Sequence, residues 1–181
     1  MSRHSTTCVL QCVSLQSPVG ELLLHGCEKG VHTITITMEN AQSAVNYADV
    51  ELNVELQRCV SWLQSYFISA KSVTSLTPPA IHHPLLQTET FSVRVLRTLQ
   101  DRVSVGETVS YKQLAEMAGN SGAVRAVGGA MRRNPVPLLI PCHRVLCSSG
   151  AIGGFMGRKG IEVKLWLLRH EGVKTNLTHT P

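Results

Sequence analysis

Residues 110–135, SYKQLAEMAGNSGAVRAVGGAMRRNP, contain two short helical patterns separated by a glycine-containing turn. In the first pattern, apolar side chains recur three and four residues apart, at Tyr111, Leu114, Ala115 and Ala118. The turn GNSG follows, and a second apolar face then begins, at Ala123, Val127, Ala130 and Met131. Two helices joined in this way form a helix-turn-helix. The pattern alone fits an ordinary helical hairpin with a solvated basic face equally well.

The second of these helices consists mostly of small residues, including Gly128 and Gly129. A glycine inside a helix costs about 1 kcal/mol relative to alanine, so tight packing or the close approach of another molecule must compensate. Such a helix fits the minor groove of DNA, about 6 Å wide, where larger side chains would clash. Arg125 is long enough to enter the base stack. A helix that reads the major groove would carry Asn, Gln and Arg at base-facing positions.

Charge is distributed unevenly along the chain. Residues 1–87 carry 4 Lys+Arg and 6 Asp+Glu, a balance of −2, whereas residues 88–181 carry 13 and 6, a balance of +7. Together these give the net charge of +5. This asymmetry suggests that the C-terminal half binds a polyanion.

The composition indicates a globular chain. Of its 181 residues, 43% are hydrophobic and 16% charged, which is unlike a disordered protein. No run approaches the roughly 18 apolar residues that cross a membrane, and MSRHSTTCVLQC is too polar for a secretory signal. The six cysteines are therefore expected to be mostly reduced and available for metal or thiol chemistry.

Upstream of the helix pair, the sequence predicts a small sheet covered by one helix. Three β-prone runs lie at residues 8–15, 20–26 and 31–38; in the third, Ile34, Ile36 and Met38 alternate with threonines. Apolar spacing becomes helical over residues 46–67, at Leu52, Leu56, Cys59, Val60, Leu63 and Phe67. Residues 69–87 contain three prolines and are interpreted as a linker. We place the boundary there, between domains of residues 1–80 and 81–181.

Beyond this boundary the chain is predicted to be mostly helical. Phe91, Val95 and Leu99 mark a first helix, with Thr88 or Thr90 as its N-cap. A last helix is expected over residues 161–170, with Gly172 as its stop signal. Strands followed by helices indicate an α+β protein.

The stretch IPCHRVLCSSG, residues 140–150, places Cys142 beside His143, a possible base, and Arg144, whose positive charge would favour a thiolate. The residues alone leave three roles open for Cys142: nucleophile, metal ligand or small buried side chain. Pro137 and Pro141 stiffen the preceding segment and make a helix or central strand there unfavourable. Adjacent residues on extended chain point to opposite sides, so a water is expected to join Cys142 to His143, with Glu171 orienting the imidazole.

Several of these motifs together resemble one family. PCHRV with the preceding NPVPLLI and the following SSG, GNSGAVRAVGGAMRRNPVP, and the closing KLWLLRHEG are similar to the O6-alkylguanine-DNA alkyltransferases in their vertebrate form. The resemblance covers residues 8–173 and is densest between residues 111 and 172. It implies an N-terminal α/β (ribonuclease H-like) domain with an antiparallel sheet, and a mostly helical winged helix-turn-helix domain after it.

The resemblance also implies an activity, the irreversible transfer of an alkyl group from O6 of guanine in duplex DNA to Cys142, after the nucleotide is flipped out. His143 and Glu171 would form a water-linked relay, Tyr111 would assist the departing base, and Asn134 would be a hinge. Arg125 would fill the space left in the duplex. The positions that match DNA contacts are Ser92, Tyr111, Asn120, Arg125 and Ser148.

A zinc site is implied in the N-terminal half. The positions that match the family's four zinc ligands are Cys8, Cys27, His32 and His82. Spacing alone supports this set weakly, and Cys12 or His83 could substitute. Four protein ligands close the coordination shell, so the zinc would be structural.

No organic cofactor is expected. The chain is expected to act as a monomer in the nucleus and to bind DNA through the minor groove.

The sequence departs from the family pattern at the pocket loop GGFMGRKGIEVK. Phe155 stands where a tyrosine is common, and about two extra residues occur near Arg158 and Lys159. Acceptance of bulky O6 adducts is therefore not implied by the resemblance.

Three other functions compete with this one. A non-catalytic helix-turn-helix regulator would need base-reading polar residues on the second helix, which are absent there. A cysteine hydrolase would need an oxyanion-hole signature, and none is recognisable. A lesion-binding protein related to the family would lack the cysteine, which this chain retains.

Overall fold

In this computed structural model, which describes residues 8–37, 51–155 and 160–174, three antiparallel strands form the N-terminal sheet. They are β1 (Gln11–Ser17), β2 (Gly20–Cys27) and β3 (Gly30–Thr37), paired in that order. Leu24 of β2 faces Val13 on one side and Ile34 on the other, so apolar side chains line up across the sheet. The predicted alternation in β3 is confirmed for Ile34 and Ile36, which are buried, with Thr35 exposed between them; Met38 lies outside the described residues.

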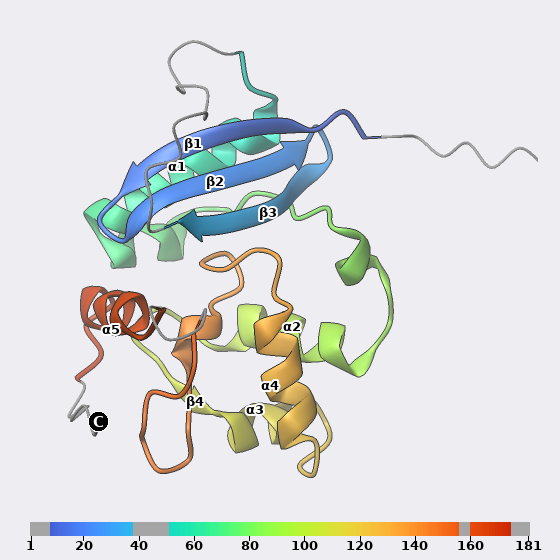
Figure 1. Ribbon diagram of the computed structural model, residues 1–181, viewed down its shortest axis with the longest axis vertical. Helices are drawn as coiled ribbons and strands as arrows, with labels where there is room; N and C mark the ends of the chain where they lie inside the picture. The colour runs from blue at the N-terminus through green and yellow to red at the C-terminus, as the bar shows by residue number, and fades with distance from the viewer. Residues whose placement is uncertain (1–7, 38–50, 156–159, 175–181) are drawn as a thin grey trace, which may run out of the picture.

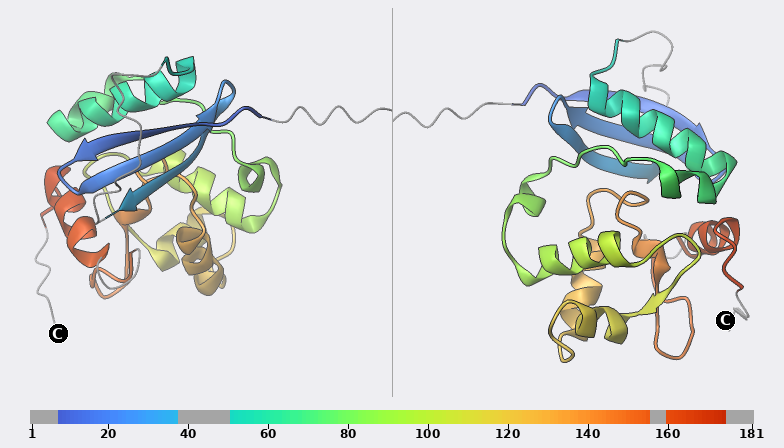
Figure 2. Two further views of the ribbon diagram at one scale, coloured as in Figure 1. Left: turned by 45° about the horizontal axis from the view of Figure 1, so that its top comes forward. Right: turned by 180° about the vertical axis from the view of Figure 1, so that it is seen from behind.

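Helix α1 (Val54–Ile68) covers one face of this sheet (Figures 1 and 2). The predicted start near residue 46 is wrong in the part of the chain that the structure describes, because residues 51–53 precede the helix. The side chain of Asn53 accepts a hydrogen bond from the backbone N–H of Leu56 and so caps the helix where it begins. The buried stripe ends at Tyr66, whereas Phe67, which was predicted to end it, is half-buried.

The segment predicted as a linker is attached to the sheet. It contains the 3-10 helices η2 (Ala70–Ser75) and η3 (Pro84–Gln87). Between them, Val31 of β3 donates to the carbonyl of Ala80 and accepts from the N–H of His82, both at 2.8 Å. Gly30 has φ +156°, and a Cβ there would lie 2.7 Å from the Ala80 oxygen, so this close approach requires glycine. The domain boundary at residue 80 stays a prediction.

The C-terminal half is mostly helical. Its elements are α2 (Phe91–Arg102), β4 (Val109–Ser110), α3 (Tyr111–Met117), α4 (Val124–Arg132), η4 (Cys142–Arg144), β5 (Val145–Leu146) and α5 (Gly160–His170). Thr90 is the N-cap of α2, and β4 and β5 form a short parallel pair. The predicted α+β class is therefore confirmed. No helix in the described ranges is long and apolar enough to cross a membrane.

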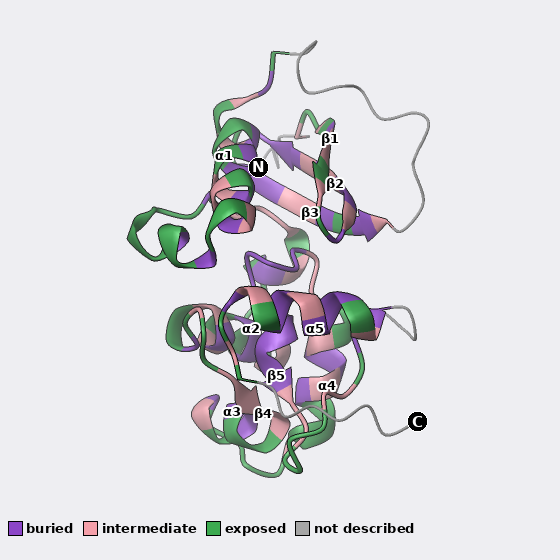
Figure 3. Ribbon diagram, turned by 90° about the vertical axis from the view of Figure 1, so that its left-hand side faces the viewer, coloured by how far each residue is buried: buried purple, intermediate pink, exposed green. Residues whose placement is uncertain are grey.

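Helices α3 and α4 form the predicted helix-turn-helix. Ser110 and Gln113 make a capping box at the start of α3, which fixes where that helix begins. Leu114 and Ala115 of α3 are buried, as are Val127 and Ala130 of α4. The two helices pack together and against α2, and exposed residues lie on the outward side of α3 (Figure 3).

The two halves meet through backbone and aromatic contacts. The backbone N–H of Ile34 in β3 donates to the carbonyl of Pro135 at 2.9 Å, so this edge of the sheet contacts the loop that leads to Cys142. On the other side, rings of α1 pack against rings of α5, including Tyr66 against His170. The sheet domain therefore contacts the loop that leads to Cys142 as well as helix α5.

Candidate active site

Cys142 lies at a pocket of about 700 Å³ between the two halves of the molecule. The lining side chains come from β3, α3, α4 and the loops on either side of Cys142, among them Ile34, Tyr111, Asn134, Cys142 and Phe155. The cysteine itself is only 7% exposed. A nearly buried thiol at an open pocket can react with a molecule that enters the pocket and is otherwise shielded from solvent.

The loop before Cys142 is rigid and non-helical, as its prolines predict. Leu138 has a positive φ of 77°, which non-glycine residues rarely adopt. Asn134 supports this conformation from both ends of its amide, because Nδ2 donates to the Ile140 carbonyl at 2.9 Å and Oδ1 accepts from the Val136 N–H at 3.1 Å. Strained backbone of this kind persists where the surroundings hold it, commonly at active sites.

Burial raises the pKa of the Cys142 thiol, so the resting group is protonated. Three features act in the opposite direction: a hydrogen bond from Asn134, the positive charge of Lys164, and the backbone N–H groups of residues 142 and 143. These are the groups that stabilise a thiolate once the proton leaves. Arg144, which the sequence suggested for this role, instead binds Glu171.

Lys164 is the functional residue near the thiol that the sequence analysis missed. Its side chain is buried on α5, and Nζ donates to the carbonyls of Val145 and Ile152 at 2.6 Å each. Burial lowers its pKa to about 8, although the nearby thiols of Cys142 and Cys147 favour its charge. One signal in the sequence could have identified Lys164. It is a lysine among the apolar residues of α5, a helix that is buried on most sides.

His143 and Glu171 meet as predicted, but by a different backbone path. Cys142–Arg144 form a 3-10 turn, so the expected extended geometry is wrong. His143 Nε2 lies 2.7 Å from Glu171 Oε1. The other ring nitrogen, Nδ1, is buried without a hydrogen-bond partner among the described residues. A buried ring nitrogen of this kind is commonly satisfied by a water, and the water expected between Cys142 and His143 stays a prediction.

The Glu171 carboxylate is also bound by Arg144, through Nε to Oε2 at 2.8 Å and Nη2 to Oε1 at 2.9 Å. Burial disfavours the charged form of Glu171, but the hydrogen bonds from His143 and Arg144 and the positive charge of Arg144 outweigh this and hold its pKa well below the usual range. Burial lowers the pKa of His143 despite the carboxylate, so the imidazole is neutral at pH 7. With Nε2–H directed to Glu171, Nδ1 is free to accept a proton.

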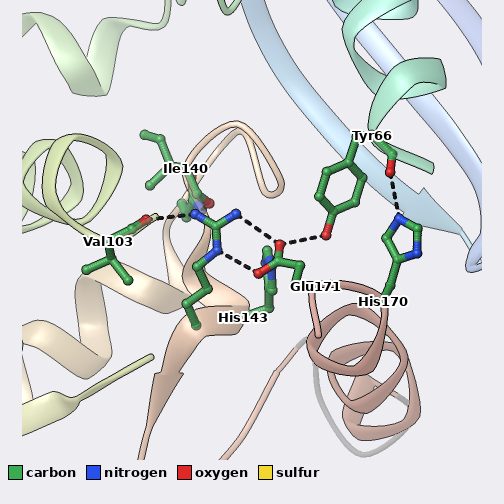
Figure 4. A network of polar contacts seen from close by, with 8 residues as sticks. Tyr66, Val103, Ile140, His143, His170 and Glu171 are labelled. Atoms are coloured by element: carbon green, nitrogen blue, oxygen red, sulfur yellow. Dashed lines mark hydrogen bonds and ion pairs between the residues drawn. The ribbon is translucent and has the colours of Figure 1, made fainter. Parts of the chain in front are cut away.

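Tyr66 also donates to Glu171 Oε1, at 2.7 Å, across the boundary between the two halves (Figure 4). No pattern in the sequence pointed to this contact. The apolar spacing of α1 indicates only which face of that helix is buried. It does not identify a hydrogen-bond partner for Tyr66 that lies 105 residues away in the chain.

Tyr111 lies at the start of α3 and lines the same pocket as Cys142. Burial and the neighbouring thiols raise the pKa of its hydroxyl, so it is a hydrogen-bond donor at neutral pH. Gly153 has φ +71°, and a Cβ there would lie 3.5 Å from the Tyr111 hydroxyl and 3.2 Å from Cys147 Sγ. A side chain at residue 153 would therefore crowd Cys147 and reach Tyr111 at an ordinary contact distance.

The other residues predicted to contact DNA lie on the helical half. Ser92 is in the first turn of α2 and accepts from Arg133 Nη2 at 2.9 Å. Asn120 lies in the turn before α4, Arg125 is exposed in the first turn of α4, and Ser148 is exposed in the turn after β5. Their roles stay predictions.

The glycines of α4 are not required by packing against the described protein. A Cβ on Gly128 would come no nearer than 3.8 Å, to Arg132, and one on Gly129 no nearer than 3.5 Å, to Arg133. Both distances are ordinary van der Waals contacts. Crowding by described side chains therefore does not explain either glycine; Gly128 lines the pocket of Cys142, whereas Gly129 is buried.

The four predicted metal ligands, Cys8, Cys27, His32 and His82, form one cluster. The distances from His82 Nδ1 are 3.6 Å to Cys8 Sγ, 3.4 Å to Cys27 Sγ and 3.2 Å to His32 Nε2. A tetrahedral zinc with bonds of about 2.0–2.3 Å separates its ligands by roughly 3.3–3.8 Å, so the donor set and its spacing fit zinc. Cys12 and His83 lie outside this cluster.

Comparison with known proteins gives the same picture for both halves. Residues 10–78 match the family described as "6-O-methylguanine DNA methyltransferase, ribonuclease-like domain", and residues 90–173 match "6-O-methylguanine DNA methyltransferase, DNA binding domain". A Homo sapiens protein named methylated-DNA–protein-cysteine methyltransferase is 46% identical over 172 residues, 91% of this chain and 82% of the relative.

Solved structures agree in fold. The crystal structure of Mycobacterium tuberculosis O6-methylguanine methyltransferase superposes with a TM-score of 0.70 at 28% identity, covering 90% of this chain and 93% of that one. A structure of OGT from the same organism in complex with DNA has a TM-score of 0.68 at 27% identity, covering 88% and 91%.

We expect Glu171→Gln to lower the free energy of unfolding by about 3–5 kcal/mol at pH 7, because Arg144 is left buried without its anion. The folded-state pKa of Glu171 lies below its unfolded value of about 4.3, so this stabilisation is present above that pH and is lost as the pH falls toward the folded value. Urea unfolding should therefore show the gap between wild type and variant narrowing below about pH 4.

The matched control is Glu162→Gln, which changes an exposed glutamate of α5, the helix that ends just before Glu171, and should alter stability by no more than about 0.5 kcal/mol. A gap of constant size from pH 7 to pH 3 would contradict the assignment of the buried charge to Glu171.

Proposed function

The chain belongs to the family of methylated-DNA–protein-cysteine methyltransferases, and we propose that Cys142 is the residue to which it transfers an alkyl group from O6 of guanine in DNA. The function is DNA repair, and the transfer is stoichiometric. The observation that carries the assignment of Cys142 is its place at the pocket beside the helix-turn-helix, next to the His143–Glu171 pair.

The reaction is a displacement at saturated carbon. The Cys142 thiolate forms a bond from sulfur to the alkyl carbon as the bond from that carbon to O6 breaks, and the electron pair of the broken bond stays on the guanine. Tyr111, protonated and at the same pocket, donates a hydrogen bond or proton to the departing base. The product is a thioether, which no group in the described site is arranged to cleave, so each molecule reacts once. No organic cofactor is needed because the thiolate accepts the alkyl group directly.

The thiol is activated through His143. A water between Cys142 and the free Nδ1 would carry the proton to the imidazole, while the Glu171 carboxylate holds Nε2–H and stabilises the imidazolium that forms. Lys164 and Asn134 stabilise the thiolate that remains. Asn134 also holds the turn that presents Cys142, which supports its predicted role as a hinge.

We assign DNA binding to the helix-turn-helix, through the minor groove. O6 of guanine is inaccessible inside a duplex, so the nucleotide must be extruded at a cost of a few kcal/mol. Arg125, exposed in the first turn of α4, is the residue that would fill the vacated stack. Gly128 lines the pocket of Cys142 and no described protein atom crowds it, so it leaves room for the extruded nucleotide. The other proposed contacts are Ser92, Tyr111, Asn120 and Ser148.

The competing functions leave features of the site unexplained. A regulator that only binds DNA needs neither the pocket nor a histidine–glutamate pair beside a cysteine. A lesion binder needs the pocket but no nucleophile. The pocket rim beyond Phe155, where the sequence departs from the family pattern, lies at residues 156–159, outside the described residues.

The Cys8, Cys27, His32 and His82 cluster is proposed as a structural zinc site. It would join the N-terminus, β2, β3 and the segment before η3, with all four tetrahedral positions taken by protein. The protein is further proposed to act as a monomer in the nucleus, where its DNA substrate lies.

We expect incubation with duplex DNA that contains radiolabelled O6-methylguanine to add one methyl group per molecule, on the peptide that contains Cys142. Mass spectrometry of the digested protein locates the label. Cys142→Ala should accept none, whereas Cys147→Ala should accept as much as wild type, because Cys147 has no assigned role. Multiple turnovers, or no transfer by protein whose Cys142 thiol is intact, would contradict the proposed function.

Arg125→Ala should slow the repair of duplex DNA by about tenfold or more while leaving the reaction with the free O6-alkylguanine base unchanged, since only the duplex requires extrusion. Single-turnover rates on both substrates measure this. Arg169→Ala, an exposed arginine of α5, is the control and should affect neither rate. Equal losses on both substrates would contradict the proposed role of Arg125.

Purified protein should contain about one equivalent of zinc by elemental analysis. Cys27→Ser should lose the metal and unfold at a lower temperature, because a structural zinc contributes to folding. Cys12 lies outside the cluster, so the Cys12→Ser protein should retain the zinc. Less than about half an equivalent in wild type would count against the site.

A further inference from the structure

Tyr66 is the partner of Glu171 that comes from the N-terminal domain. It lies on α1, is 1% exposed, and its hydroxyl donates to Glu171 Oε1 at 2.7 Å. In Figure 4 the phenol of Tyr66 points from α1 at the carboxylate of Glu171, beside which His143 lies. The proposed relay therefore continues across the domain boundary.

The position of this hydroxyl is held by contacts on both sides of the ring. Trp62 stacks on the Tyr66 ring at a centroid distance of 5.7 Å and an interplanar angle of 3°. His170 meets the same ring edge-on at 5.2 Å, and its Nε2 lies 2.6 Å from the Tyr66 carbonyl oxygen. His170 precedes Glu171 in the chain, so α1 and the end of α5 are joined at both the backbone and the side chain of Tyr66.

The direction of the hydrogen bond is defined by chemistry. Burial and the Glu171 charge raise the pKa of the Tyr66 phenol, so the hydroxyl keeps its proton. The carboxylate is ionised because its own pKa is held low, and it can only accept. The phenol therefore donates to a charged acceptor, which is the stronger class of hydrogen bond.

Tyr66 and His143 share one oxygen of the carboxylate. Oε1 accepts from Tyr66 Oη, His143 Nε2 and Arg144 Nη2, whereas Oε2 accepts from Arg144 Nε. Electron density drawn toward one donor is less available to the others, so the phenol weakens the pull of Oε1 on a proton at His143. The titratable and charged groups around this pair are Tyr66 of α1, Cys142 and Arg144 of η4, Lys164 and His170 of α5, and Glu171 itself.

We propose that Tyr66 is a positioning residue for alkyl transfer: its hydrogen bond orients Glu171 and limits the basicity of Oε1, and thereby tunes the proton affinity of His143. The N-terminal domain thus takes a direct part in activating the cysteine. This inference rests on the proposed function of Cys142 and His143, and adds to it a residue from outside the helical half.

The test is the pH dependence of the single-turnover transfer rate in Tyr66→Phe. Loss of the donor leaves more negative charge on Oε1, which favours protonated His143, so the acid limb of the profile should move to higher pH. The rate near neutral pH should fall roughly threefold to tenfold. The loss should be equal on duplex DNA and on the free O6-alkylguanine base, because Tyr66 does not line the pocket. The NMR titration of the His143 imidazole should move to higher pH in the same variant.

Replacement of Tyr66 by 3-fluorotyrosine keeps the ring and gives a stronger donor, so it should move the acid limb in the opposite direction, to lower pH. Gln64→Ala, at an exposed position of the same helix α1, is the control and should leave the profile in place.

A folded Tyr66→Phe protein with the wild-type profile and the wild-type His143 titration would overturn the inference. If Tyr66→Phe does not fold, the protein with 3-fluorotyrosine at residue 66 provides the test. A pH–rate profile identical to that of wild type in this protein would also overturn the inference. If the wild-type protein transfers no alkyl group, the proposed function itself is wrong. The inference about Tyr66, which rests on that function, would then be wrong as well.

Discussion

The buried carboxylate of Glu171 is the interaction on which the site and the domain arrangement depend. A charge removed from water costs several kcal/mol unless hydrogen bonds and opposite charge replace its hydration. Here the replacement comes from α1, through Tyr66, and from the turn after the rigid loop, through His143 and Arg144. Because three separate segments must converge on one carboxylate, satisfying its charge also sets the orientation of the imidazole beside Cys142.

A protein that reacts once and is consumed requires a nucleophile that stays inert until its substrate arrives. Burial would give this property to Cys142, the proposed acceptor, because it raises the thiol pKa and keeps the sulfur protonated. The groups that oppose burial, Asn134 and Lys164, lie close enough to stabilise the thiolate during the reaction. The same residues hold the backbone on either side of the cysteine, so the electrostatics and the rigidity of the site have common causes.

The N-terminal domain reaches the site at two places. The edge of β3 binds the carbonyl of Pro135 in the loop before Cys142, and Ile34 lines the pocket. Tyr66 of α1 reaches the carboxylate on the other side. Pairing of Val31 with residues 80 and 82 secures the same strand and brings His82 to the metal cluster. The sheet is therefore a support for the reaction centre as well as a separate layer.

The sequence by itself determined the class of the fold, the helix pair, and the cysteine with its histidine and glutamate. Apolar periodicity reports which face is buried, and the motifs around Cys142 are specific enough to indicate the chemistry. The tertiary structure decided which cation faces the thiol, Lys164 in place of Arg144, and that Tyr66 binds Glu171. It also showed that the chain around His143 is a 3-10 turn, and that α1 begins at Val54. These features depend on partners supplied by distant segments or on a single capping side chain, and a local pattern carries information about burial but not about which distant group satisfies a buried charge.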